Sequence, residues 1–153
     1  MNSFDALVAD FAEKTGVPSG KTGADSIDVI ADGVLVSAQH RPERDDCVIF
    51  TLPLADAKPD CDMLRRALEL AADGTGTAGH FLGLNNGMFV LSAVLPLEGL
   101  STEDFAKRLL MLAAASHAVA QAILSAPIGG GSSGGDREVG LPTHDKENDL
   151  MRV

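Results

Sequence analysis

The sequence has no tryptophan or tyrosine, and aromatic residues make up only 4% of its 153 residues. A hydrophobic core must therefore be built from aliphatic side chains and alanine, which an apolar fraction of 45% can supply. No apolar run approaches the roughly 18 uninterrupted residues of a spanning helix, so we expect no membrane insertion. The length suits one folded domain.

Cysteine is scarce as well. Cys47 and Cys61 lack the CxxC spacing of metal or redox motifs, and two residues do not make a disulfide framework. We expect no secretory leader. We therefore expect two reduced thiols, packed as small hydrophobic side chains, in a cytoplasmic protein.

Positive charge is in the minority, with 12 Lys and Arg against 22 Asp and Glu and a formal net charge of −10. An acidic surface repels phosphate backbones and anionic lipid headgroups, which disfavours nucleic acid and membrane surfaces as partners. A basic partner, or one that must be kept soluble, fits better.

Motifs of common catalytic and metal sites are missing. The four histidines lack HxxxH or HExxH spacing, and His80 is expected at the exposed rim of a strand. The segment 16–22 has three rather than four residues between its first glycine and Gly-Lys-Thr, and it follows a helix instead of a strand, unlike a phosphate-binding loop. We expect an exposed loop over 16–25, no cofactor, no metal and no enzyme activity.

Hydrophobic periodicity predicts an α+β fold in the order α-β-β-β-α-β-β-α. Phe4, Leu7, Val8 and Phe11 recur at helical spacing and indicate a first amphipathic helix that ends at Gly16. The apolar runs indicate a largely antiparallel five-stranded sheet with three helices. The predicted strands lie near 27–29, 34–38, 47–54, 82–84 and 88–95.

Turn and cap residues indicate where these elements meet. Asp32-Gly33 and Asn86-Gly87 predict tight hairpins, since these residues tolerate the positive φ of a primed turn. Asp60 and Ser101 are suitable N-caps for the second and third helices. The third helix, of about 25 residues at 1.5 Å each, is long enough to cover a sheet face.

The composition changes after Ser125. Pro127 ends the helical pattern, residues 129–135 form a Gly/Ser linker, and the charged remainder has no periodicity. We predict a folded domain over residues 1–126 and a linker with a disordered tail over residues 127–153.

A strand, a turn, a second strand, a short link and a long helix carry Leu82-Gly83-Leu84, Leu95-Pro96-Leu97, Leu100-Ser101 and Phe105 in that order. This pattern resembles the type III secretion chaperones of the CesT/SycE kind, the Tir chaperone family, and the likeness extends loosely over residues 3–125. The resemblance implies the same element order, a homodimer and a bacterial cytoplasmic location. It also implies a secreted effector as client, whose extended N-terminal segment wraps around the dimer.

Apolar faces in excess of the core indicate protein binding. The second helix is expected to meet a second copy of the chain, and the first helix with the neighbouring sheet is expected to receive the client. The acidic surface suits solubility of the complex and the approach of a secretion ATPase or a basic client. The predicted dimer residues are Met63, Leu64, Ala67, Leu68 and Ala71. The predicted client-binding residues are Phe4, Leu7, Val8, Phe11, Val34, Val36, Ile49 and Leu52.

Two other classes stay open. One is a non-secretory interaction module of the roadblock or longin type, in which a helix lies between the second and third strands. In this chain the second predicted helix follows three strands. The other class is a small enzyme, which a cluster of polar groups in a deep pocket would favour.

Overall fold

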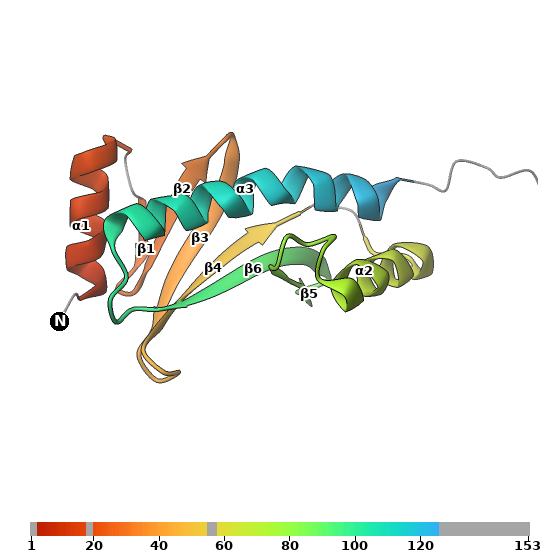
Figure 1. Ribbon diagram of the computed structural model, residues 1–153, viewed down its shortest axis with the longest axis horizontal. Helices are drawn as coiled ribbons and strands as arrows, with labels where there is room; N and C mark the ends of the chain where they lie inside the picture. Colours follow the sequence, from red (N-terminus) through yellow and green to blue (C-terminus); the bar gives the residue numbers. More distant parts are fainter. Residues whose placement is uncertain (1–2, 18–19, 55–57, 126–153) are drawn as a thin grey trace, which may run out of the picture.

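The computed structural model describes residues 3–17, 20–54 and 58–125. Within these residues the chain forms three helices and one six-stranded antiparallel sheet (Figure 1). The elements are α1 (Phe4–Thr15), β1 (Gly20–Gly23), β2 (Ser26–Ala31), β3 (Val34–Arg41), β4 (Cys47–Pro53), α2 (Cys61–Asp73), β5 (Phe81–Asn85), β6 (Met88–Pro96) and α3 (Thr102–Leu124).

The α+β class is confirmed, but the predicted count of five strands is wrong. The additional strand, β1, falls where an exposed loop was expected, and it pairs antiparallel with the edge of β2 through Gly20↔Asp28 and Lys21↔Ile27. Its sequence, Gly-Lys-Thr-Gly, has no apolar alternation, so periodicity could not reveal it. Backbone pairing with a neighbouring strand is enough to order such a segment.

Both predicted hairpin turns are present. Asp32 and Gly33 have φ values of 49° and 77°, and Asn86 and Gly87 have 50° and 78°. Positive φ at both central residues is the conformation of a type I′ turn, whose twist matches that of the flanking strands. These hairpins join β2 to β3 and β5 to β6 in a sheet of order β1-β2-β3-β4-β6-β5.

The helices begin at the predicted caps. The side chains of Asp60 and Ser101 accept hydrogen bonds from the backbone N–H groups of Met63 and Asp104. Helix α3 crosses the sheet and contacts β2, β3, β4 and β6, while α1 and α2 lie toward opposite ends of it (Figure 1). None of the described helices is long and apolar enough to cross a membrane.

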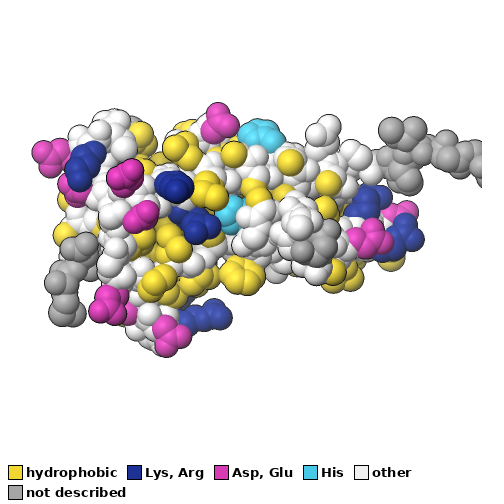
Figure 2. Space-filling model, viewed as in Figure 1, with side chains coloured by type: hydrophobic (Ala, Val, Ile, Leu, Met, Phe, Trp, Pro, Cys, Tyr) yellow, Lys and Arg dark blue, Asp and Glu magenta, His cyan; other side chains and the backbone are white. Residues whose placement is uncertain are grey.

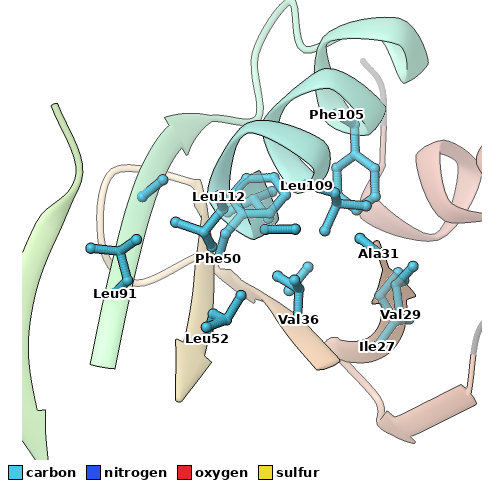
Figure 3. Close-up of a cluster of buried hydrophobic side chains, with 14 of the residues drawn as sticks. Ile27, Val29, Ala31, Val36, Phe50, Leu52, Leu91, Phe105, Leu109 and Leu112 are labelled. Atoms are coloured by element: carbon cyan, nitrogen blue, oxygen red, sulfur yellow. The ribbon is translucent and has the colours of Figure 1, made fainter. Parts of the chain in front are cut away.

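The core lies between α3 and one face of the sheet (Figure 3). Phe105 of α3 is fully buried, and its ring lies 5.3 Å from that of Phe11 on α1 and 5.2 Å from that of Phe50 on β4. The Thr102 hydroxyl also donates to Asp10, which fixes α1 to the start of α3. Helix α1 is therefore part of the protomer's own core.

The third helix ends at Leu124, close to the predicted end at Ser125. The predicted linker and tail over residues 127–153 lie outside the described residues, so the boundary at residue 126 stays a prediction.

Candidate protein-binding surfaces

Each strand turns alternate side chains to opposite faces of the sheet. In β2, Ile27, Val29 and Ala31 are buried under the helices, whereas Ser26, Asp28 and Ile30 face the other way. The described helices pack on the face that carries the buried side chains. We call the opposite face the outer face, and among the described residues no element covers it.

Strand pairing arranges the outer face in rows across the sheet. One row is the pair Ile30↔Leu35 of β2 and β3, which is 67% and 48% exposed. The next joins Asp28, Ser37, Thr51, Ser92 and Phe81. A third joins Gln39, Ile49 and Val94.

The middle row is polar from β2 to β6 and becomes apolar only at Phe81 of β5. The Ser37 hydroxyl donates to Asp28 over 2.6 Å, and Thr51 and Ser92 lie beside them in the sheet. The outer face thus offers apolar side chains on either side of a polar row. An extended peptide has a matching period of two, with one set of side chains facing the sheet.

Seven of the eight predicted client-binding residues lie on the helix side of the sheet or in α1. Val36 and Leu52 are fully buried, because strand alternation directs them toward α3. Val34 is partly buried on the same side, whereas Ile49 is on the outer face. The apolar face of α1 is also buried in the protomer, and the client contact of its side chains stays a prediction. These buried residues of α1 are Phe4, Leu7, Val8 and Phe11.

Reasoning from the sequence missed Ile30, Leu35, Val94 and Phe81, the large exposed side chains of the outer face. A signal for the first two was present. The apolar residues at 27, 29 and 31 define the buried face of this strand, so Ile30 must point to the opposite face, where a polar residue is expected. Leu35 is paired with Ile30 across the hairpin and lies on the same face.

A second apolar surface lies between α2 and the edge strand β5. A groove of about 180 Å³ there is lined only by apolar residues. Leu68 and Leu84 flank it and are 71% and 52% exposed. The full lining is Leu64, Ala67, Leu68, Ala71, Leu82, Gly83, Leu84 and Phe89.

The predicted dimer residues divide between this groove and the core. Met63 and Ala67 are 7% exposed and belong to the core cluster, although Ala67 also reaches the groove. Leu64, Leu68 and Ala71 line the groove without being fully buried. We call Leu64, Leu68, Ala71 and Leu84 the α2–β5 patch.

A histidine holds the end of the sheet together near α1. His40 Nε2 lies 2.7 Å from an Asp46 carboxylate oxygen, and its Nδ1 lies 3.7 Å from Asp25. The imidazole is stacked on the Phe4 ring with a centroid distance of 5.5 Å. Through these contacts His40 connects the β1–β2 and β3–β4 turns to α1. We therefore assign His40 a role in stability and none in binding or catalysis.

Two expectations about polar side chains were wrong. His80 is buried, with 5% of its surface exposed, instead of lying at an exposed rim. Cys47 is buried as expected, but Cys61, the first residue of α2, is exposed. Within the described residues, no group of three or more His, Cys, Asp or Glu side chains is placed to hold a metal ion.

Comparison with known proteins agrees with this architecture. The model of the Tir chaperone protein (CesT) family matches residues 6–120. No curated protein matches the sequence.

Three solved structures share the fold. A chain of the HopA1–SchA chaperone–effector complex has a TM-score of 0.63 at 18% identity, over 77% of this chain and 93% of that one. A chain of the ExsC–ExsE complex has a TM-score of 0.63 at 20% identity, over 81% and 96%. The third is from the Yersinia pestis type III secretion chaperone SycH in complex with a fragment of YscM2. Its TM-score is 0.52 at 17% identity, over 76% and 99%.

Proposed function

The chain belongs to the Tir chaperone protein (CesT) family, and from that premise we propose that it is a type III secretion chaperone. It binds the N-terminal segment of a secreted effector as a homodimer in the bacterial cytoplasm. It keeps that segment soluble and competent for export, and it consumes no ATP and catalyses no reaction. Chains of two chaperone–effector complexes have the same fold as this chain, which supports the proposal.

The observation that carries the proposal is the uncovered outer face. Ile30 and Leu35 form an exposed apolar pair, and half-buried Ile49 lies beside exposed Val94 across β4 and β6. Isolated exposed apolar residues are ordinary, but paired ones in a sheet make a contiguous surface that suits a partner. We assign the client to this face, with Ile49 retained from the sequence prediction.

The two edges of the sheet have different surroundings. Strand β5 is next to α2 and the α2–β5 patch, whereas β1 is the edge beyond β2. An extended client segment that pairs with β1 would continue the sheet by strand addition, while its side chains reach the outer face. The segment becomes ordered only on binding, which lowers the affinity gained per unit of buried area.

The α2–β5 patch is the proposed dimer interface. It is apolar, it includes the small residue Ala71, and Leu68 extends from it into solvent. A twofold axis through such a patch brings each leucine onto the groove of the other copy, as an isologous contact requires. Full burial of one leucine side chain contributes roughly 1.5–3 kcal/mol, and a twofold contact buries each patch leucine in both copies.

Co-expression with the product of the neighbouring gene tests client binding. We expect a soluble complex of two copies of this chain with one effector, whose protected region after limited proteolysis is its N-terminal segment. The double variant I30D/L35D should lose at least nine-tenths of the retained effector, because charge is introduced into an apolar contact. The matched control is Gln39→Asp, an exposed residue of the same face. Retention of the effector by I30D/L35D would rule out the outer face as the client site.

Sedimentation equilibrium tests the dimer separately. We expect a dimer for the unaltered chain and a monomer for Leu68→Asp. The matched control Leu110→Asp changes an equally large, 57% exposed leucine on α3 and should stay dimeric. If the unaltered chain is a monomer, the proposed homodimer is wrong, but the assignment of the client to the outer face is unaffected.

A further inference from the structure

We propose that the chain beyond α3 folds back and docks on an exposed apolar side of that helix. Val139 and Leu141 are the anchors of this tail. The residues that receive them, which we call the exposed α3 side, are Leu110, Met111, Ala114 and Ala118. The docking goes beyond the proposed function, because it depends neither on the client nor on the dimer.

The exposed α3 side is a continuous apolar surface. Leu110 and Met111 are 57% and 43% exposed, and the two alanines are exposed as well. Positions four apart lie on the same side of a helix, so Leu110, Ala114 and Ala118 form a row with Met111 beside it. The described elements leave this row open to solvent.

This part of the helix carries no formal charge. Residues 109–125 contain no Lys, Arg, Asp or Glu, whereas 22% of the whole chain is charged. In Figure 2 the charged side chains along α3 are gathered over its first half, and further along the helix the surface is hydrophobic or uncoloured. A solvated helix side carries charged and polar residues opposite its buried stripe. The composition therefore indicates a side that another segment covers.

A cleft at one end of the exposed α3 side has room for a larger side chain. Met111 belongs to both, and the cleft has a volume of about 410 Å³. Leu95 and Leu100 add apolar walls. Its charged lining residues are two acids and two bases, namely Glu98, Asp104, Lys107 and Arg108. Because the two signs balance, these charges select no ionic ligand, and the apolar walls decide what fits.

The size of this surface favours an occupant from the same chain. The row from Leu110 to Ala118 is about 12 Å long, and a helix with its side chains is about 10–12 Å wide. Even with the cleft, such a contact is on the order of a few hundred Å², well below the roughly 800 Å² per partner of a stable complex. A tethered segment has an effective concentration in the millimolar range, so a small contact is enough to hold it.

The tail begins where it can reach this surface. It continues from Ser125 at the end of α3, and Leu110 lies about 21 Å back along the helix from Leu124. A Gly/Ser-rich segment of about ten residues has an average end-to-end distance of roughly 16–19 Å. Residues 126–135 are mostly Gly and Ser, so the chain from Asp136 onward is within reach of the exposed α3 side.

The anchors follow from the composition of the tail. Residues 139–143 are the first apolar stretch after the Gly/Ser segment, and they contain no Lys, Arg, Asp or Glu. Val139 and Leu141 are two positions apart, so in an extended chain their side chains point to the same side. Pro142 favours an extended backbone at the preceding Leu141. We therefore assign Val139 to the row at Leu110 and Leu141 to the cleft beside Met111.

The experiment uses the full chain labelled with nitrogen-15. The double variant V139D/L141D should lower the docking equilibrium constant at least about tenfold, because it places charge in an apolar contact. We expect the amide signals of residues 107–118 to move relative to the unaltered chain, equally at every protein concentration and also in the Leu68→Asp background. The matched control L150D/M151D adds two charges farther along the tail and should leave these signals unchanged.

A second variant approaches the contact from the helix. In the unaltered chain, the heteronuclear NOE of residues 139–142 should exceed that of residues 129–135, and Leu110→Asp should remove this difference. Unmoved α3 signals in V139D/L141D would overturn the inference. So would equal changes in L150D/M151D, which would mean a general charge effect, or docking that disappears on dilution, which would mean a second copy. The remaining amide signals verify folding, and V139D/L141D provides the test if L110D does not fold.

Discussion

Replacement of His80 by leucine should stabilise the protein. The imidazole is buried, and at most one of its two nitrogens has a hydrogen-bond partner, the Met111 backbone; a buried polar atom without a partner costs about 1–3 kcal/mol. Leucine has a similar size and leaves no polar atom in the cavity. We expect His80→Leu to raise the free energy of unfolding at pH 7.5 by about 1 kcal/mol or more.

The gain should grow as the pH falls. Burial and the neighbouring Arg108 charge lower the pKa of His80 in the folded state below the 6.5 of an ordinary histidine. Below pH 6.5 His80 binds a proton in the unfolded chain but not in the folded one. The free energy of unfolding of the unaltered chain therefore decreases as the pH drops toward the folded-state pKa, and H80L lacks this decrease. The linkage slope for one proton is at most about 1.4 kcal/mol per pH unit.

Urea unfolding of the unaltered chain and of His80→Leu at pH 7.5 and 5.5 measures both effects. The difference between the two proteins cancels the titration of the other groups. His117→Gln, at an exposed position on α3, is the control and should change stability by less than about 0.5 kcal/mol at either pH. A destabilised H80L, or a difference that does not depend on pH, would refute the assignment of a neutral, incompletely hydrogen-bonded imidazole.

Three further results are expected. Phe105→Ala should lower the free energy of unfolding by about 3–5 kcal/mol in urea, because it removes the ring that joins α1, α3 and β4; a loss under 1 kcal/mol would contradict this packing. Ser101→Ala should cost about 1 kcal/mol in the same assay through loss of the α3 cap, and Ser101→Asp should restore most of it. A thiol reagent should label Cys61 rapidly and Cys47 only after unfolding, and equal rates under native conditions would argue against the described burial.

Local chemistry explains which parts of the fold were predictable. Asn86-Gly87 and Asp32-Gly33 specify their turns through φ, and Asp60 and Ser101 specify helix starts through one hydrogen bond each. These signals need no knowledge of the tertiary structure. The long periodic stretch of α3 was equally clear, since its apolar residues recur on one helical face.

The missed features depend on packing between distant segments. Strand β1 is ordered by pairing with β2, and its own composition indicates a loop. His80, the residue before β5, is buried next to Arg108 and Met111 of α3, which are distant from it in the sequence. The sequence also did not show that Val36 and Leu52 point toward the helices. Alternation separates the residues of a strand into two sets, but the position of the covering helix decides which set is buried.

The two faces of the sheet have different roles: the helix side stabilises the protomer, and the outer face is available for binding. The large buried side chains, such as Phe50, Phe105 and Leu91, are all on the helix side, so the hydrophobic stabilisation of the protomer comes from that side. Side chains of the outer face then contribute little to folding and are free to suit a partner. Ile30→Asp should therefore change the unfolding free energy by less than about 1 kcal/mol, whereas its effect on effector retention, in combination with Leu35→Asp, should be nearly complete. A large loss of stability would mean that the outer face is part of the protomer's own core, and the client would need another surface.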